Sequence, residues 1–206
     1  MYARTTTVQG DPAAIDEGVA FLRDRVMPAV EGLPGYVGLS MLADRDSGRC
    51  IATTSWKDEA AMADTGEQLR PLRARFAEVL GGSVELHTWE IAVVHRVREA
   101  PDGACTRVTW TRTDPSRMAP ALDAYRTRLL PRLEELDGFC SASLLVDPRE
   151  GRAAASATYA DRLTLERSRT DATAVREEFA AAGNGEITEV AEFELVLAHL
   201  RVPDTA

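Results

Sequence analysis

Two arginines stand at matching places in two similar segments of the chain, Arg73 and Arg176. Both lie among apolar residues at helical spacing, so an inward guanidinium would bring positive charge beside the core. A guanidinium there could bind a carboxylate or enolate oxygen of a ligand. The more ordinary role is an ion pair with a local acid such as Glu78 or Glu177.

Large aromatic residues and a histidine form the second group of candidates. Trp56 and its counterpart Tyr159 each end a predicted strand, where they would serve as packing or as a pocket wall. His87 has no counterpart in the second segment and could transfer protons near neutral pH, although a hydrogen-bonded surface histidine is more common. Trp110 replaces Thr7, so the two segments are expected to have diverged.

The first strand of each segment carries an arginine, Arg4 or Arg107. Because both faces of the sheet should be covered, each charge needs a partner, and a structural ion pair is the favoured prediction. Cys50, Cys105 and Cys140 lack CxxC spacing, which indicates small buried hydrophobes rather than a zinc site or a disulfide framework.

Several classes of function receive no support. The chain has no nucleophile elbow, P-loop, strand-following GxGxxG or HExxH. A net charge of −9 opposes a nucleic-acid partner. No leader pattern and no long apolar run is present, so we expect a cytoplasmic protein with no membrane contact.

An internal repeat decides the architecture that must position these residues. A shift of 103 residues aligns 4–78 with 107–181 without a gap. One inserted residue then brings Glu90 onto Glu194 and His95 onto His199. Such a period is too long for a solenoid. We therefore predict a first domain at 1–97, a linker at 98–103 and a second domain at 104–206.

Each repeat has the pattern strand, helix, two strands, helix, strand. In the first, we expect strands at 2–9, 36–43, 50–56 and 84–94, a helix from Asp11-Pro12 to about residue 31, and a second from Asp58 to Gly81. This is the ferredoxin-like α+β plan, with both helices on one face of an antiparallel sheet. The other face is also apolar, so the tandem copy should cover it and form an intrachain pseudo-dimeric barrel.

The segment Ala52-Thr-Thr-Ser-Trp56-Lys-Asp-Glu-Ala-Ala, with Leu33-Pro-Gly-Tyr upstream, resembles the antibiotic-biosynthesis monooxygenase-like domains of the dimeric α+β barrel superfamily. The resemblance covers nearly the whole chain in two copies. The resemblance is specific for the fold but not for the function, because the superfamily contains oxygenases, haem-degrading enzymes, cyclases and isomerases.

The quinone-forming monooxygenases in this family need no metal or organic cofactor, so the resemblance implies none here. Their strand-end tryptophan matches Trp56, and their helix-2 arginine matches Arg73. Their asparagine falls at Ala52, and their helix-2 tyrosine falls at Met62. The haem-degrading branch needs a helix-2 histidine, and no histidine lies between residues 57 and 80.

Three functions stay open. The leading hypothesis is a cofactor-independent monooxygenase for a planar aromatic or polyketide-like molecule, with Trp56, Arg73 and His87 as catalytic residues. The alternatives are a non-catalytic small-molecule-binding or stress-related protein, and a cyclase or isomerase with His87 as base. The partner is expected to be a small molecule, bound by a monomer with an internal pseudo-dimer, and further homodimerisation stays open. The predicted substrate-binding residues are Trp56, Met62, Phe76, Tyr159, Arg176 and Trp110.

Overall fold

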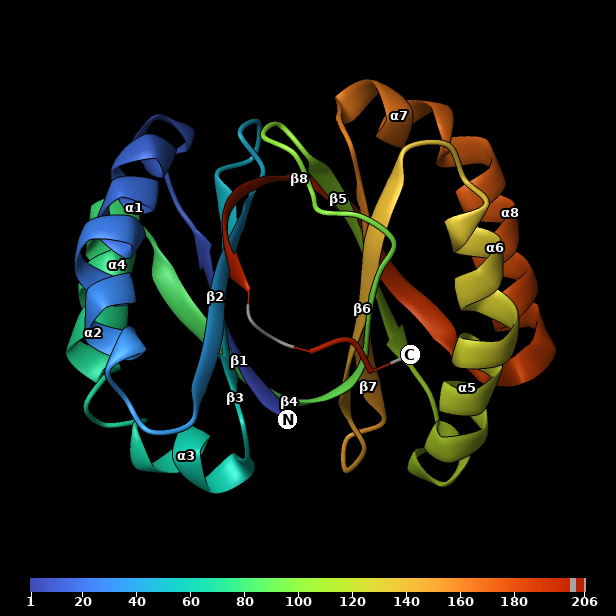
Figure 1. Cartoon of the computed structure of the whole chain (residues 1–206), viewed down its shortest axis with the longest axis horizontal. Helices are drawn as coiled ribbons and strands as arrows, with labels where there is room; N and C mark the ends of the chain where they lie inside the picture. Colours follow the sequence, from blue (N-terminus) through green and yellow to red (C-terminus); the bar gives the residue numbers. More distant parts are fainter. Residues whose placement is uncertain (201–202, 206) are drawn as a thin grey trace. The chain divides into compact units, whose positions relative to one another are not determined.

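The computed structural model describes residues 1–200 and 203–205. The chain divides into two compact units. Unit 1 contains Met1–Trp89 and Phe193–Val202, and unit 2 contains Glu90–Glu192 and Pro203–Ala206. Figure 1 colours the chain along its sequence and labels its helices and strands.

The sheet of unit 1 is built on three full strands, β1 (Tyr2–Gln9), β2 (Tyr36–Ala43) and β3 (Arg49–Trp56). Strand β3 lies between the other two and is antiparallel to both. The segment after Phe193 of β8 (Glu186–Leu200) extends the sheet along β2. The predicted strands are therefore confirmed, and β-branched and apolar residues fill them as expected.

The first helical region of unit 1 is a single run with a π-helical turn inside it. A short 3-10 turn (Pro12–Ala14) leads into α1 (Ile15–Phe21), the π turn (Leu22–Val26) and α2 (Met27–Glu31). The run begins at Asp11, whose carboxylate accepts a 2.9 Å hydrogen bond from the Ala13 amide. Pro28 has no N–H to give to the preceding turn, which accounts for the widened turn before it.

The second helical region differs from the continuous helix predicted from Asp58 to Gly81. It consists of α3 (Glu59–Asp64) and α4 (Arg70–Leu80). Between them the Thr65 hydroxyl donates to the Ala61 carbonyl at 2.9 Å. Pro71 cannot donate to a preceding turn, so it begins a new helix instead of continuing the old one.

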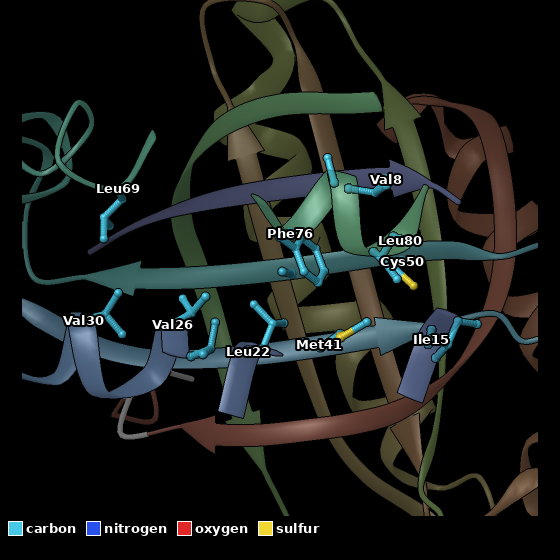
Figure 2. Packing of buried hydrophobic residues seen from close by; sticks show 14 of the residues in the cluster. Val8, Ile15, Leu22, Val26, Val30, Met41, Cys50, Leu69, Phe76 and Leu80 are labelled. Atoms are coloured by element: carbon cyan, nitrogen blue, oxygen red, sulfur yellow. The ribbon is translucent and has the colours of Figure 1, made fainter. Parts of the chain in front are cut away.

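The core of unit 1 lies between the helices and their sheet (Figure 2). Ile15, Leu22, Val26 and Val30 project from one helix face toward apolar side chains of β1, β2 and β3. All three cysteines are buried, as predicted, and none of the three forms a disulfide. Burial raises the pKa of the Cys50 thiol to about 11.

Unit 2 repeats the same order of elements. Its strands are β5 (Cys105–Arg112), β6 (Phe139–Asp147) and β7 (Arg152–Tyr159). Its helices are α5 (Met118–Ala124), α6 (Leu130–Glu134), α7 (Arg162–Arg167) and α8 (Arg169–Phe179). A second π turn, Tyr125–Leu129, falls at the repeat position of the first and again precedes a proline, Pro131.

Two long strands belong to both units. The last part of β4 (Ser83–Arg96) pairs with β6 from Glu90 onward, as β8 pairs with β2 from Glu194 onward. The hydrogen-bonded order is β1-β3-β2-β8-β5-β7-β6-β4, which closes into an antiparallel eight-stranded barrel. The predicted fold class is therefore confirmed. The compact units do not coincide with the sequence repeats. The end of β4 comes from the first repeat but belongs to unit 2, and the end of β8 comes from the second repeat but belongs to unit 1.

No helix in the described part of the chain is long and apolar enough to cross a membrane.

Candidate functional site

Unit 2 contains a pocket between its sheet and its helices, which we call the unit 2 pocket. It encloses about 820 Å³ of space, part of it open to solvent. Its walls are mostly apolar, which is typical of sites for small organic molecules. The polar side chains on its lining are Arg107, Thr109, Thr111, Thr113, Tyr125, Ser156, Tyr159, Arg176 and Asn184.

Two tyrosine hydroxyls in this lining have no hydrogen-bond partner among the described residues, those of Tyr125 and Tyr159. Tyr125 begins the π turn and is 2% exposed, while Tyr159 ends β7 and is fully buried. A buried hydroxyl without a partner costs about 1–3 kcal/mol. Burial, with Tyr159 close by, raises the pKa of Tyr125, so its phenol stays a neutral donor. Both hydroxyls are thus available to an acceptor in the pocket.

Arg176 brings a positive charge to the same pocket from α8. Its Nη2 donates to the Thr173 hydroxyl at 2.9 Å, and no carboxylate of the described residues lies within 4.0 Å of its guanidinium. Burial and the neighbouring charge of Arg107 lower its pKa. The predicted partnership with Glu177 is therefore not formed, because the guanidinium turns to the pocket side of the helix.

Arg107 has the structural ion pair that its position predicted. Its Nε and Nη2 donate to one carboxylate oxygen of Glu192 at 3.0 and 2.8 Å. Its other bonds reach Ser168 and the Leu165 carbonyl. Burial alone would raise the pKa of Glu192, but hydrogen bonds from Arg169 and Arg107 outweigh it and hold that pKa below its usual value. Arg107 is thus neutralised, and Arg176 provides the uncompensated charge.

Unit 1 has a pocket at the equivalent place, the unit 1 pocket, with about 430 Å³ of space, part of it open to solvent. Three replacements distinguish the two sites. Leu22 stands in the place of Tyr125, Trp56 in that of Tyr159, and Leu69 in that of Ala172. The first two remove both hydroxyls, and the third fills space that the unit 2 pocket leaves open.

The predicted site residues are distributed over several places. Arg73 and Phe76 line the unit 1 pocket, and Tyr159 and Arg176 line the unit 2 pocket. Arg73 donates to the Gly66 carbonyl at 2.7 Å and does not form the predicted ion pair with Glu78, which binds Arg75.

The remaining candidates line neither pocket. Trp56 and Met62 are buried in the core of unit 1, where the Trp56 indole donates to Thr54 at 3.2 Å. His87 is one-quarter exposed and lies 3.8 Å from a Glu85 oxygen, and its ring is tilted by 38° to that of Trp89 at a centroid distance of 5.6 Å. Trp110 lies on β5, partly buried.

Tyr125 and Phe179 are lining residues that the sequence analysis did not single out. The signal for Tyr125 was present, because a tyrosine replaces Leu22 within an otherwise apolar helix stripe. In the described part of the chain, no group of three or more histidine, cysteine or acidic side chains is placed to hold a metal ion.

Comparison with solved structures identifies the class of fold. An anthrone oxidase-like protein matches with a TM-score of 0.68 and 16% identity, covering 100% of this chain and 95% of its own. A ferredoxin-fold protein of Listeria monocytogenes related to antibiotic biosynthesis monooxygenases matches with a TM-score of 0.56 and 10% identity, over 95% and 94% of the two chains. The chain has the fold of these monooxygenase-like proteins, as the sequence resemblance predicted.

The same fold also serves a heme-degrading enzyme of Listeria monocytogenes, with a TM-score of 0.52, 8% identity and coverage of 95% and 99%. At such identities the likeness establishes the fold and leaves the activity to the site.

Sequence comparison then gives the family. No family model matches the chain. The uncharacterized protein Rv2557 of Mycobacterium tuberculosis is 46% identical over 204 residues, covering 99% of this chain and 91% of its own length. Rv2558 of the same organism is 44% identical over 205 residues, covering 99% and 87%. The chain belongs to the family of these two mycobacterial proteins.

Proposed function

We propose that the chain is a monooxygenase that acts on a planar, hydroxylated aromatic molecule in the unit 2 pocket without a bound metal or organic cofactor. The observation that carries the proposal is the uncompensated Arg176 guanidinium beside two unpartnered tyrosine hydroxyls in an apolar pocket. Such a lining suits an aromatic molecule whose oxygen becomes negatively charged during reaction. The monooxygenase-like fold adds support of a general kind.

The chemistry follows from an anthrone-type substrate, in which a CH₂ group is conjugated to a carbonyl. Loss of one CH₂ proton leaves an anion whose charge rests on the carbonyl oxygen. Arg176 would stabilise that oxygen electrostatically, and Tyr125 and Tyr159 would donate hydrogen bonds to it. The apolar walls would strengthen these interactions by excluding water.

The carbon anion then reduces O₂ and forms a C–O bond, giving a hydroperoxide after it takes up a proton. Loss of water from the hydroperoxide leaves a carbonyl. One oxygen atom of O₂ enters the product and the other leaves as water, and the substrate CH₂ supplies all four electrons. The proton released in the first step passes to water at the pocket opening, since no carboxylate or imidazole lines the pocket.

The absence of such a base from the lining favours a second candidate, a protein that binds the same molecule without turnover. The cyclase alternative depended on His87 as base, and neither pocket offers support for it because His87 lines neither.

The test uses dithranol, a dihydroxyanthrone, with oxygen uptake measured above its spontaneous oxidation. We expect one O₂ to be consumed per dithranol converted, and the rate to fall in Arg176→Gln and in Ala172→Leu, which copies the Leu69 of unit 1. Arg73→Gln is the matched control in unit 1. Saturable binding without enzyme-dependent oxygen uptake would overturn the oxygenase and support the binding protein. No binding at all would overturn both.

A further inference from the structure

The unit 1 pocket contains two arginines that have no acidic partner. Arg4 lies on β1 and Arg73 on α4, and both line this pocket. No carboxylate of the described residues forms an ion pair with either guanidinium; the nearby Glu67 binds Arg70 at 3.2 Å. Two half-buried positive charges in one small pocket therefore lack an ion-pair partner among the described residues.

Backbone carbonyls at the break between α3 and α4 hold both guanidiniums in place. Arg4 donates through Nη2 to the Met62 carbonyl at 2.9 Å, and Arg73 donates through Nη2 to the Gly66 carbonyl at 2.7 Å. Their remaining donors include Arg4 Nη1 and Arg73 Nε, which are buried and without a partner. Each side chain is thus positioned but retains an unused hydrogen-bond donor.

Unit 2 shows how the fold neutralises the equivalent arginine with an acid of its own. There Glu192 binds Arg107, the counterpart of Arg4, through two hydrogen bonds. The repeat correspondence places Thr88 where unit 2 has Glu192. Unit 1 therefore has the arginine but lacks the acid at the matching position. Burial lowers the pKa of both arginines, and the charge of Arg4 lowers that of Arg73 further.

The rest of the lining restricts the kind of anion. Apart from the arginines and two threonines, the pocket is walled by apolar side chains, and its space, solvent at the opening included, is about 430 Å³ against about 820 Å³ in unit 2. A polycyclic molecule suits the larger pocket better.

We propose that unit 1 binds a small carboxylate with a short apolar body, its oxygens on Arg4 and Arg73 and its body against the apolar walls. Guanidinium and carboxylate form strong charge-assisted hydrogen bonds, and the ligand would supply the acceptor that Glu192 supplies in unit 2. This site is separate from the unit 2 pocket and does not depend on its proposed chemistry.

The test is a calorimetric titration of the full chain with butyrate, in an Arg176→Gln background that removes the free guanidinium of unit 2. We expect saturable binding of one butyrate per chain, weakened about tenfold or more by adding Arg4→Gln or Arg73→Gln. Arg70→Gln, an exposed arginine at the start of the same helix, is the matched control and should leave the affinity unchanged. Unfolding curves of each variant verify that it is folded.

Two further arms identify the chemistry. Thr88→Glu restores the acid of unit 2 and should abolish butyrate binding in a folded protein. Butanol, which lacks the charge, and inorganic phosphate, which lacks the apolar body, should both bind more weakly than butyrate. The proposal is overturned if butyrate does not bind, if Arg70→Gln weakens binding as much as Arg73→Gln does, or if phosphate or butanol binds as tightly.

Discussion

The two equivalent arginines, Arg4 and Arg107, should respond very differently to the same substitution. Arg107→Gln removes a buried cation whose carboxylate partner, Glu192, is only 19% exposed. Breaking a buried pair from one side costs roughly 3–5 kcal/mol. We expect the lower end, about 3 kcal/mol, because Arg169 still reaches Glu192 at 2.8 Å.

Arg4→Gln removes one hydrogen bond to the Met62 carbonyl, a contribution of about 1 kcal/mol. It also removes an uncompensated, half-buried charge, which offsets part of that loss. The two substitutions should therefore differ by about 2 kcal/mol in unfolding free energy. Urea unfolding followed by circular dichroism measures this difference, with a single transition as the condition for interpreting it.

The difference should also depend on pH in a defined direction. Because the pKa of Glu192 in the folded protein lies below its usual value of 4.5, its pairing stabilises the fold fully above that value. This contribution disappears as the pH falls through the lowered folded pKa. The cost of Arg107→Gln should thus shrink in acid. Two results would refute the reasoning. One is an equal loss of unfolding free energy in Arg4→Gln and Arg107→Gln at neutral pH, and the other is a loss in Arg107→Gln that does not shrink below pH 4.5.

Three other predictions concern a tyrosine, two glycines and the three cysteines. Tyr125→Phe removes a hydroxyl without a partner, so the stability of the free protein should hold or rise while affinity for the aromatic ligand falls; a large loss of stability in thermal unfolding would contradict this. Gly48→Ala should lower the unfolding free energy by more than about 2 kcal/mol, because Gly48 has a φ of +77° and a new Cβ would clash with the Gly10 carbonyl oxygen. Gly81→Ala, with a φ of +71° and open space around it, should lower the unfolding free energy by only about 1–2 kcal/mol. Equal losses in the two glycine variants on urea unfolding would show that the close approach of Gly48 to Gly10 is unimportant. The three cysteines should react with a thiol reagent only after unfolding, since all are buried and the pKa of Cys50 is raised to about 11; rapid labelling of the native protein would contradict their burial.

The strands, the repeat and the fold class could be predicted because they rest on local signals. Residues 2–9 and 36–43 carry the composition of strands, and Asp11-Pro12 begins a helix by its own chemistry. The break before α4 was missed, because apolar spacing alone does not show where Pro71 starts a new helix.

The site was harder to predict because it depends on where side chains turn. Spacing placed Arg73 and Arg176 on helices but could not show that neither takes a local acid. Trp56 matched a family pattern, yet it packs into the core of unit 1. The sharing of β4 and β8 between the units was also hidden, since a long strand has the same pattern whichever partner it pairs with.

The most direct test of the central claim is the stoichiometry and location of aromatic binding. Calorimetric titration with danthron, the quinone product of dithranol, should give one site per chain. Ala172→Leu, which fills the unit 2 pocket, should abolish that site, and Arg73→Gln should leave it intact. Danthron binding that survives Ala172→Leu, or that is lost in Arg73→Gln alone, would contradict the assignment of unit 2 as the site of aromatic binding.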